Sequence, residues 1–208
     1  VGTLTYVGHG ALSGATQVPQ GTLAVDGPLP RSATHVAGGA TLSGGGTVGA
    51  TSVGSGATVA PGIAHANHGI GTLTVNGDYT QAAGSTYQVN VLGASNATDR
   101  IDATGNAHID GGTLNVTRAG PSAYGLDTRY TVLSAKGGIV GAYAGLTGDT
   151  QGAFVELKDS YDANHVYLTA TRSRSFLSAG GTRNQRSTGE GLDALTDVLQ
   201  GDKTVKKI

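Results

Sequence analysis

Two of the six histidines lie close together in this sequence and could bind a metal ion. His65 and His68 lie in the stretch IAHANHG, at a spacing that suits two ligands of one metal ion if a third ligand came from elsewhere in the fold. The alternative is a loop that simply exposes both imidazoles, and we favour it. The sequence alone leaves the role of this loop open.

Three aspartates offer a second kind of site. Carboxylates bind calcium, and a row of them could resemble the acidic clusters of polysaccharide lyases built from stacked strands. Asp99, Asp102 and Asp110 fall at different places in the repeats described below, however, with no second acidic row beside them. No serine stands in a GxSxG motif, and no local motif indicates a Ser-His-Asp set. We therefore predict no catalytic residue, no metal site and no cofactor, and expect that this chain is not an enzyme.

The composition bounds the remaining possibilities. The chain has 208 residues, a formal net charge of −1, 13% charged residues and no cysteine. This charge favours neither nucleic acid nor an anionic membrane as a partner, and disulfides and thiolate metal sites are excluded. No run of about 18 apolar residues predicts a membrane span, and no signal peptide is visible. The sequence opens in the middle of a repeat at Val1, so we expect a piece of a longer protein.

A glycine-rich repeat organises the elements that would position any site. The segment from Val36 to Leu42 recurs from Val53 to Val59, and shorter versions begin at Val18 and Ile109. The first three copies start 18 and 17 residues apart, which suits one three-sided turn of strands better than two packed helices. Stacked coils would place the apolar residues in two inward columns, one of Val18, Val36, Val53 and Ile109 and the other of Leu23, Leu42, Val59 and Leu114. The fold predicted is all-β: a right-handed parallel β-helix, or solenoid.

The second half of the chain predicts more strands and one helix. Strands are expected at Leu73–Val75, Tyr87–Val91 and Tyr130–Ala135, with a turn at Asn76-Gly77. Phe154–Leu157 and Val166–Ala170 read as an antiparallel hairpin with Val155 and Leu157 against Val166 and Leu168. This hairpin would cap the end of the solenoid. We predict that the core of this cap consists of Leu133, Val155, Leu157, Val166 and Leu168.

A polar linker and a short helix end the chain. Arg172, Arg174, Arg183 and Arg186 indicate a solvated tether, with lipopolysaccharide or the lumen of a membrane barrel as alternative contacts. Ser187 and Glu190 have capping-box spacing, and Gly201 is placed as a stop. One apolar face of this predicted helix consists of Leu192, Leu195 and Leu199.

Taken together, these stretches resemble the C-terminal part of bacterial autotransporter passengers, which belong to type V secretion. The resemblance spans nearly the whole chain and is carried by GGATLSGGGTVGA, SGATVAPG, IGTLTVNGDYTQAAGSTYQV, DRIDATGNAHIDGGTLNV and TRNQRSTGEGLDAL. The first 27 residues are similar to the stretch that follows the catalytic domain in subtilisin-like members. The loop after Pro61-Gly62 is longer than the family pattern.

The resemblance implies a domain order and a role. Residues 1–120 would form the β-helical stem of the passenger, 121–172 an autochaperone or cap block, and 173–208 a linker and helix that lead to an outer-membrane β-barrel. The chain would promote folding and secretion across the periplasm and outer membrane, and display an upstream virulence or effector domain at the cell surface or in the medium. Its partners would be its own barrel translocator and the upstream passenger, with a host surface or serum protein as a further candidate. Two alternatives stay open: an adhesin-type binding module, and the stem of a secreted serine protease or esterase whose catalytic domain lies upstream.

Overall fold

The repeated apolar positions lie beside one another on neighbouring strands. The computed structural model describes residues 2–8, 12–62, 69–93, 95–152 and 154–205, with side chains as far as residue 195. Val18 pairs with Val36 and Val36 with Val53, while Leu23 pairs with Leu42 and Leu42 with Val59. Both predicted columns are therefore confirmed. Each holds one further residue before its last member, Gln81 in the first column and Tyr87 in the second.

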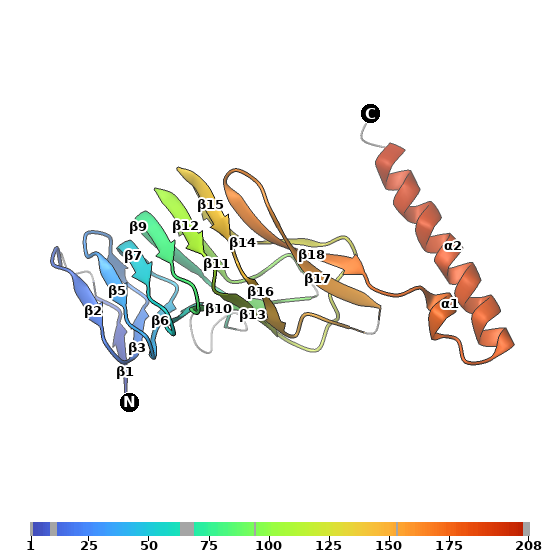
Figure 1. The fold of residues 1–208 in the computed structure, drawn as a ribbon, viewed down its shortest axis with the longest axis horizontal. Coiled ribbons are helices and arrows are strands. Elements are labelled where there is room, and N and C mark those ends of the chain that lie inside the picture. Colours follow the sequence, from blue (N-terminus) through green and yellow to red (C-terminus); the bar gives the residue numbers. More distant parts are fainter. Residues whose placement is uncertain (1, 9–11, 63–68, 94, 153, 206–208) are drawn as a thin grey trace.

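Three ladders of parallel strands run along the molecule (Figure 1). The first consists of β1 (Thr3–Tyr6), β3 (Gly21–Val25), β6 (Ala40–Gly44), β8 (Thr58–Pro61), β10 (Thr86–Val91), β13 (Thr113–Arg118) and β16 (Gly145–Gly148). The second consists of β4 (Pro28–Leu29), the first parts of β7 (Thr47–Val53) and β9 (Thr72–Gln81), β11 (Arg100–Ala103) and β14 (Arg129–Ala135). The third consists of β2 (Thr16–Val18), β5 (Thr34–Val36), the last parts of β7 and β9, β12 (Asn106–Asp110) and β15 (Gly138–Ala142). The all-β class is confirmed, and successive segments of the chain alternate among the ladders.

Two glycines show how closely neighbouring coils approach. Gly44 has φ 110°, and a Cβ built on it would lie 2.2 Å from the carbonyl oxygen of Val25 on the preceding coil. Gly77 has φ 138°, and its Cβ would lie 3.0 Å from the Cβ of Ala50. The predicted turn at Asn76-Gly77 is wrong, because β9 continues through it and passes from β11 to β12 as its partner. Glycine permits this bend without ending the strand.

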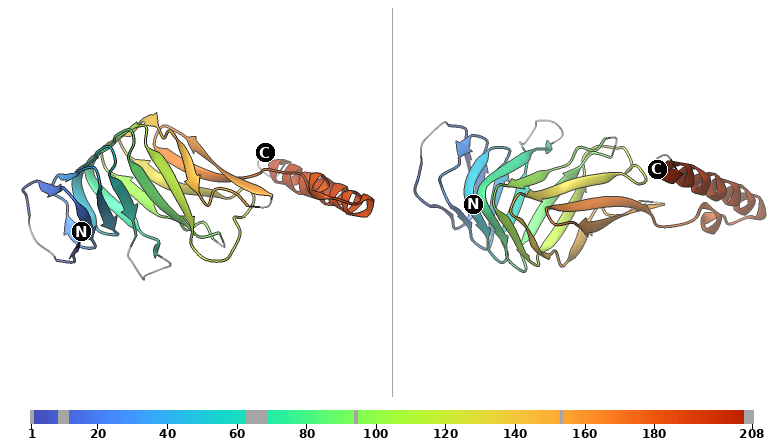
Figure 2. Two further views of the ribbon diagram at one scale, coloured as in Figure 1. Left: turned by 60° about the horizontal axis from the view of Figure 1, so that its bottom comes forward. Right: turned by 90° about the horizontal axis from the view of Figure 1, so that it is seen from above.

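An antiparallel hairpin completes the second ladder. β17 (Val155–Tyr161) and β18 (His165–Arg172) pair with each other, and β18 also pairs antiparallel with β14, so this sheet is mixed (Figure 2). The predicted hairpin is confirmed, but its register is not. Val155 lies opposite Arg172 and Leu157 opposite Ala170, because β17 runs on to Tyr161 and leaves a shorter turn. β14, β15 and β16 continue the parallel ladders beyond residue 121, and the proposed boundary at 120/121 stays a prediction.

Two helices follow the hairpin. α1 spans Phe176–Ala179 and α2 spans Arg183–Val205. The capping box predicted at Ser187 is wrong: the Gln185 N–H donates to Thr182 Oγ1 at 3.3 Å, and Gln185 Oε1 accepts from the Thr182 N–H at 3.0 Å. The helix therefore begins earlier than predicted, and it continues past Gly201. No helix in the described part of the chain is long and apolar enough to cross a membrane.

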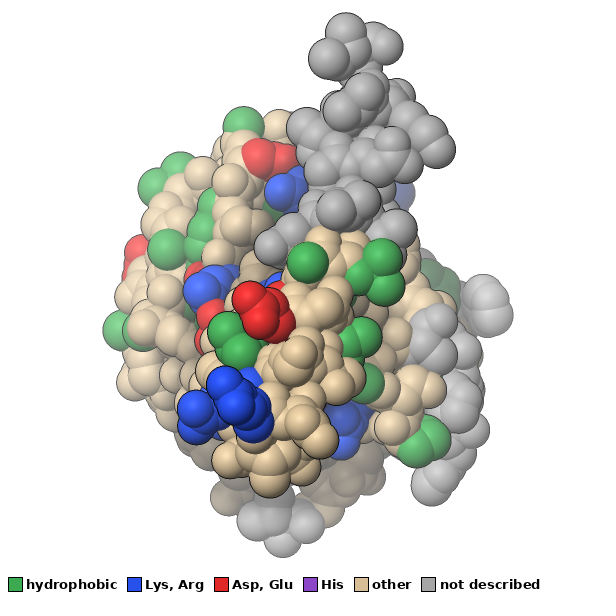
Figure 3. Space-filling view, turned by 90° about the vertical axis from the view of Figure 1, so that its right-hand side faces the viewer, with side chains coloured by type: hydrophobic (Ala, Val, Ile, Leu, Met, Phe, Trp, Pro, Cys, Tyr) green, Lys and Arg blue, Asp and Glu red, His purple; other side chains and the backbone are tan. Residues whose placement is uncertain are grey.

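The expected arginine tether is partly folded onto these helices. The Arg172 guanidinium forms an ion pair with the Asp193 carboxylate and lies over the Phe176 ring, 5.1 Å from its centroid. Arg186 Nε donates to the Gly180 carbonyl at 3.1 Å. Figure 3 shows this end of the molecule, where side chains of both charges are interspersed on a mostly neutral surface. Two of these arginines thus have partners within the chain.

The Asp193 carboxylate connects α2 to the end of the hairpin. It accepts hydrogen bonds from the backbone N–H groups of Phe176 at 2.8 Å and Leu177 at 3.1 Å, in addition to the ion pair with Arg172. The rings of Phe154 and Phe176 pack against each other with centroids 4.6 Å apart. The exposed Leu192 and Leu195 belong to the predicted apolar helix face, and the side chain of Leu199 lies outside the described residues.

Replacing Asp193 tests this contact. Asp193→Asn removes the negative charge and places an amide N–H₂ against one of the backbone donors, so α1 and the start of α2 should separate from the hairpin. We expect faster tryptic cleavage after Arg174 and Arg183, measured by mass spectrometry of timed digests. Asp110→Asn, on the exposed end of β12, is the matched control and should leave these rates unchanged. Equal cleavage of the wild type and Asp193→Asn would contradict the contact.

Candidate functional site

The apolar residues predicted for the cap meet where the hairpin covers the last coil. Leu133, Val166 and Leu168 are fully buried, Leu157 is 5% exposed, and Val155 packs against the same core while partly buried. Leu133 lies directly opposite Val166 in the antiparallel pair and beside Ile101 in the parallel pair. The structure therefore brings these residues together at one end of the core, and their role in folding stays a prediction.

A cluster of buried polar side chains lies next to this apolar core. Gln81 Oε1 accepts hydrogen bonds from the hydroxyls of Tyr79 at 2.7 Å and Tyr143 at 3.0 Å, and all three side chains are buried. Tyr87 packs against Tyr143 with ring centroids 6.3 Å apart, and its hydroxyl donates to the Val132 carbonyl of β14 at 2.6 Å. Because a buried hydroxyl without a partner is costly, Gln81 is the acceptor on which two tyrosines depend.

This cluster also reaches the hairpin. The backbone N–H of Tyr143 donates to the Tyr161 hydroxyl oxygen at 3.0 Å, and the Tyr161 hydroxyl donates to Asp159 Oδ2 at 2.7 Å. Tyr161 and Asp159 both belong to β17. Gln81 on β9 is thereby connected through Tyr143 to the outermost strand of the hairpin, across three separate parts of the chain.

Burial keeps these tyrosines in the form that donates hydrogen bonds. Desolvation raises the pKa of Tyr79, Tyr87 and Tyr143 far above the ordinary value of a phenol. The hydroxyls therefore stay protonated at pH values where an exposed phenol would ionise. Gln81 Nε2 is buried without a hydrogen-bond partner among the described residues. The Gln81 amide therefore takes part in the cluster through its oxygen atom and not through its NH₂ group.

Asp99 is a second buried polar group, directly before β11. Its carboxylate accepts from the Gly71 N–H through Oδ1, and from the Asn90 N–H and Nδ2 through Oδ2, each at 2.9 Å. Burial outweighs these donors and raises the pKa of Asp99 to about 7. The carboxylate holds Gly71, directly before β9, against β10.

The remaining candidates that the structure describes do not come together in one site. His65 and His68 lie outside the described residues. Asp99 is buried, Asp102 pairs with Arg100 at 2.6 Å, and Asp110 is exposed at the end of β12. Among the residues that the structure describes, no group of three His, Cys, Asp or Glu side chains is arranged to hold a metal ion.

Sequence reasoning missed the polar cluster and the buried role of Asp99. A signal for Gln81 was present: in the first column it takes the place between Val53 and Ile109, which are aliphatic residues on the two neighbouring coils. A polar residue at an inward repeat position predicts a buried hydrogen-bond network. Tyr143 follows β15 directly and has no repeat counterpart, so its contact with Gln81 could be found only in three dimensions.

Comparison with known proteins finds two relatives of this chain that are extracellular proteins. The chain is 32% identical to an extracellular serine protease of Serratia marcescens over 215 aligned residues, and 27% identical to a second one over 217. It is similar to part of two extracellular serine proteases. Each alignment covers 99% of this chain and 20% of the relative, so the chain spans about a fifth of the length of the curated relatives it matches. No protein-family model matches the chain.

Gln81→Val tests whether the polar cluster stabilises the fold. The variant restores an aliphatic column but leaves the Tyr79 and Tyr143 hydroxyls without their acceptor, so we expect a loss of about 2 kcal/mol in the free energy of unfolding in urea. The triple variant Gln81→Val, Tyr79→Phe, Tyr143→Phe removes donors and acceptor together, and should regain most of that loss. Equal destabilisation in the single and triple variants would show that packing, not hydrogen bonding, explains the effect.

Asp99 predicts a specific dependence of stability on pH. Its folded-state pKa of about 7 lies above its unfolded value of about 4, so the folded state binds more protons between these values and stability should fall as pH rises through this window. The slope attributable to Asp99 should be at most about 1.4 kcal/mol per pH unit. Urea midpoints of the wild type and Asp99→Asn, measured across this pH range, isolate the contribution of Asp99, because the other titrating groups contribute equally to both proteins. Parallel pH profiles would contradict the prediction.

Proposed function

We propose that this chain is the non-catalytic stem and autochaperone of an autotransporter passenger, and that its three ladders form a right-handed parallel β-helix. In this proposal it promotes vectorial folding across the outer membrane and displays an upstream domain at the cell surface or in the medium. The observation that carries it is the hairpin end, where β17 and β18 cover the last coil and Gln81, Tyr143 and Tyr161 connect them to its interior.

The mechanism is thermodynamic. There is no nucleotide outside the cell, so the free energy that makes export irreversible must come from folding. A stack of parallel strands gains free energy coil by coil, because each coil buries its apolar face only against its neighbours. Coil formation has to begin somewhere, and a hairpin that covers the last coil offers local antiparallel contacts that close with a short loop. The next coils would then add to an ordered edge.

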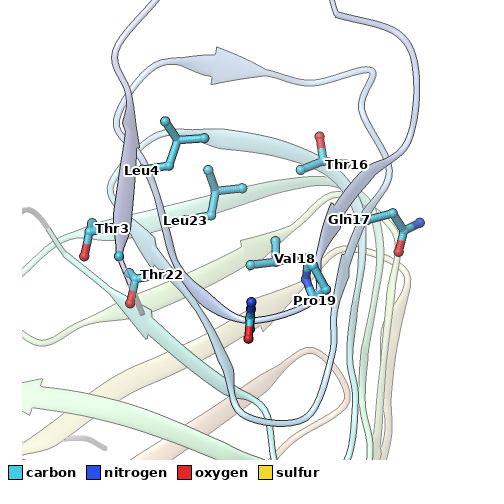
Figure 4. Close-up of a pocket in the computed structure, with 10 residues that line it drawn as sticks. Thr3, Leu4, Thr16, Gln17, Val18, Pro19, Thr22 and Leu23 are labelled. Carbon is cyan, nitrogen blue, oxygen red and sulfur yellow. The ribbon is translucent and has the colours of Figure 1, made fainter.

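The opposite end supports addition of further coils. Within the described residues β1 pairs only with β3, and Leu4 on β1 is 69% exposed although Leu4, Leu23 and Leu42 occupy the same column. Figure 4 shows Leu4, Leu23 and Val18 around a cavity of about 360 Å³ at this end. In the proposal, a preceding coil of the upstream passenger packs on Leu4 and continues the column.

The relatives favour one class of upstream domain. Both are extracellular serine proteases, and the chain matches about a fifth of each. We therefore infer that the parent of this chain carries a protease domain outside the 208 residues, and that the chain itself supplies no catalytic group. The exposed side chains of Leu192 and Leu195 on α2 would contact the barrel translocator in the same scheme.

Leu133→Asp tests the folding role in the full-length protein. The substitution places an unpaired carboxylate between Ile101 and Val166, and breaking the cap core in this way should destabilise it by more than about 3 kcal/mol. Surface display of the parent, measured by antibody binding to intact cells, should fall severalfold. Thr169→Asp adds the same charge on the outer face of the hairpin between Arg129 and Lys158, and should leave display unchanged. Normal display of Leu133→Asp would count against the proposal.

A further inference from the structure

A polar cavity lies on the outer face of the second ladder, close to the hairpin. Its volume is about 360 Å³, and its polar lining comes from three adjacent strands and from the loop between β10 and β11: Thr72, Asn96, Thr98, Arg100, Arg129 and Thr131. The size falls within the range of cavities that hold small ligands. The lining is unusual for a chain with only 13% charged residues, because two arginines face one hollow.

Arg129 is held in position without an ion pair. Its guanidinium lies over the Tyr167 ring, 4.3 Å from the centroid, and the Tyr167 hydroxyl donates to Asp162 Oδ2 at 2.7 Å. The His165 ring stacks on Tyr167 with centroids 5.5 Å apart. Among the described residues no carboxylate lies within salt-bridge distance of Arg129. The guanidinium is therefore oriented by an aromatic face while its charge stays available to an external anion.

Arg100 is only partly neutralised. One nitrogen, Nη2, bonds to Asp102 Oδ2 at 2.6 Å, while Nε is buried with no hydrogen-bond partner in the described part of the chain. The two arginines and one aspartate leave the cavity with a net positive charge. The guanidinium fork matches a carboxylate in geometry, and the three threonine hydroxyls and the Asn96 amide can donate to or accept from further polar groups.

We propose that this cavity binds a carboxylate-bearing sugar. The arginines would hold the carboxylate, and the threonines and Asn96 would contact the ring hydroxyls. A bare anion would use the arginines but leave the hydroxyl-bearing side chains to water, and a neutral sugar would supply no counter-ion for the Arg129 guanidinium. The stem would then do more than fold, since it would attach the exported protein to acidic saccharides.

Titration calorimetry of the intact chain with glucuronate tests the site. We expect saturable binding of glucuronate, no saturation with glucose, and weaker binding of acetate and inorganic phosphate. Arg129→Gln should weaken glucuronate binding about tenfold or more, since it removes charge-assisted hydrogen bonds. Arg129→Lys keeps the positive charge but loses the forked guanidinium group, so its affinity for glucuronate should lie between those of the wild type and Arg129→Gln. Arg118→Gln, an exposed arginine on β13, is the matched control and should bind as the wild type does.

Several outcomes would overturn the proposal. Absence of saturable glucuronate binding would do so, as would equal binding of glucose or an Arg129→Gln variant with unchanged affinity. Phosphate or acetate binding as tightly as glucuronate would show a simple anion site with no recognition of the sugar ring. The affinities for glucuronate and for an oligouronide then show whether the natural ligand is a free monosaccharide or the end of a polymer. Arg129 is exposed, so circular dichroism of its variants should match the wild type and loss of binding cannot be assigned to unfolding.

Discussion

The parallel register between successive coils is the constraint on which the rest of the structure depends. Once Val36 lies beside Val53 and Leu42 beside Val59, every strand presents one face to the interior and the other to solvent. A shift by one residue would turn the apolar columns outward. The chain must therefore turn at matching points of successive coils even though the coils differ in length, and the backbones at these corners must pass close together. Gly44 meets both needs, since its positive φ and its contact with Val25 leave no room for a Cβ.

Regular apolar columns define the register between paired strands, but they do not determine which coil lies next to which in the stack. Val36, Val53 and Val59 are similar enough that a stack displaced by a whole coil would still bury aliphatic groups. Gln81 reduces this ambiguity through Tyr143, whose hydroxyl reaches Gln81 Oε1 from a segment 62 residues further along the chain. In a displaced stack this hydroxyl would lose its acceptor, whereas Tyr79 lies two residues from Gln81 on the same strand and would keep it. The cost of an unpaired buried donor thus favours one stacking order.

The sequence predicted what is periodic and local, and failed where contacts are unique and distant. The two columns and the hairpin followed from recurring aliphatic residues and alternating strands, and both were confirmed. The register of the hairpin could not be predicted, because nothing in the polar stretch after Leu157 indicates that β17 continues to Tyr161. The start of α2 was predicted five residues late, at Ser187 in place of Thr182. Thr182 and Gln185 have the same spacing as Ser187 and Glu190, and only the structure distinguishes the two capping boxes.

The hairpin end differs from the rest of the stack in what stabilises it. In the coils, each strand gains its backbone partners from neighbours whose own position depends on further coils. At the hairpin, β17 and β18 are joined by a turn of three residues, 162–164, and their pairing needs no distant segment. The buried contact of Leu133 with Val166 and the hydrogen bond of Tyr143 with Tyr161 then connect this local unit to β14 and β15. The two ends therefore differ: one has a local antiparallel unit, and at the other, among the described residues, β1 has a single partner strand.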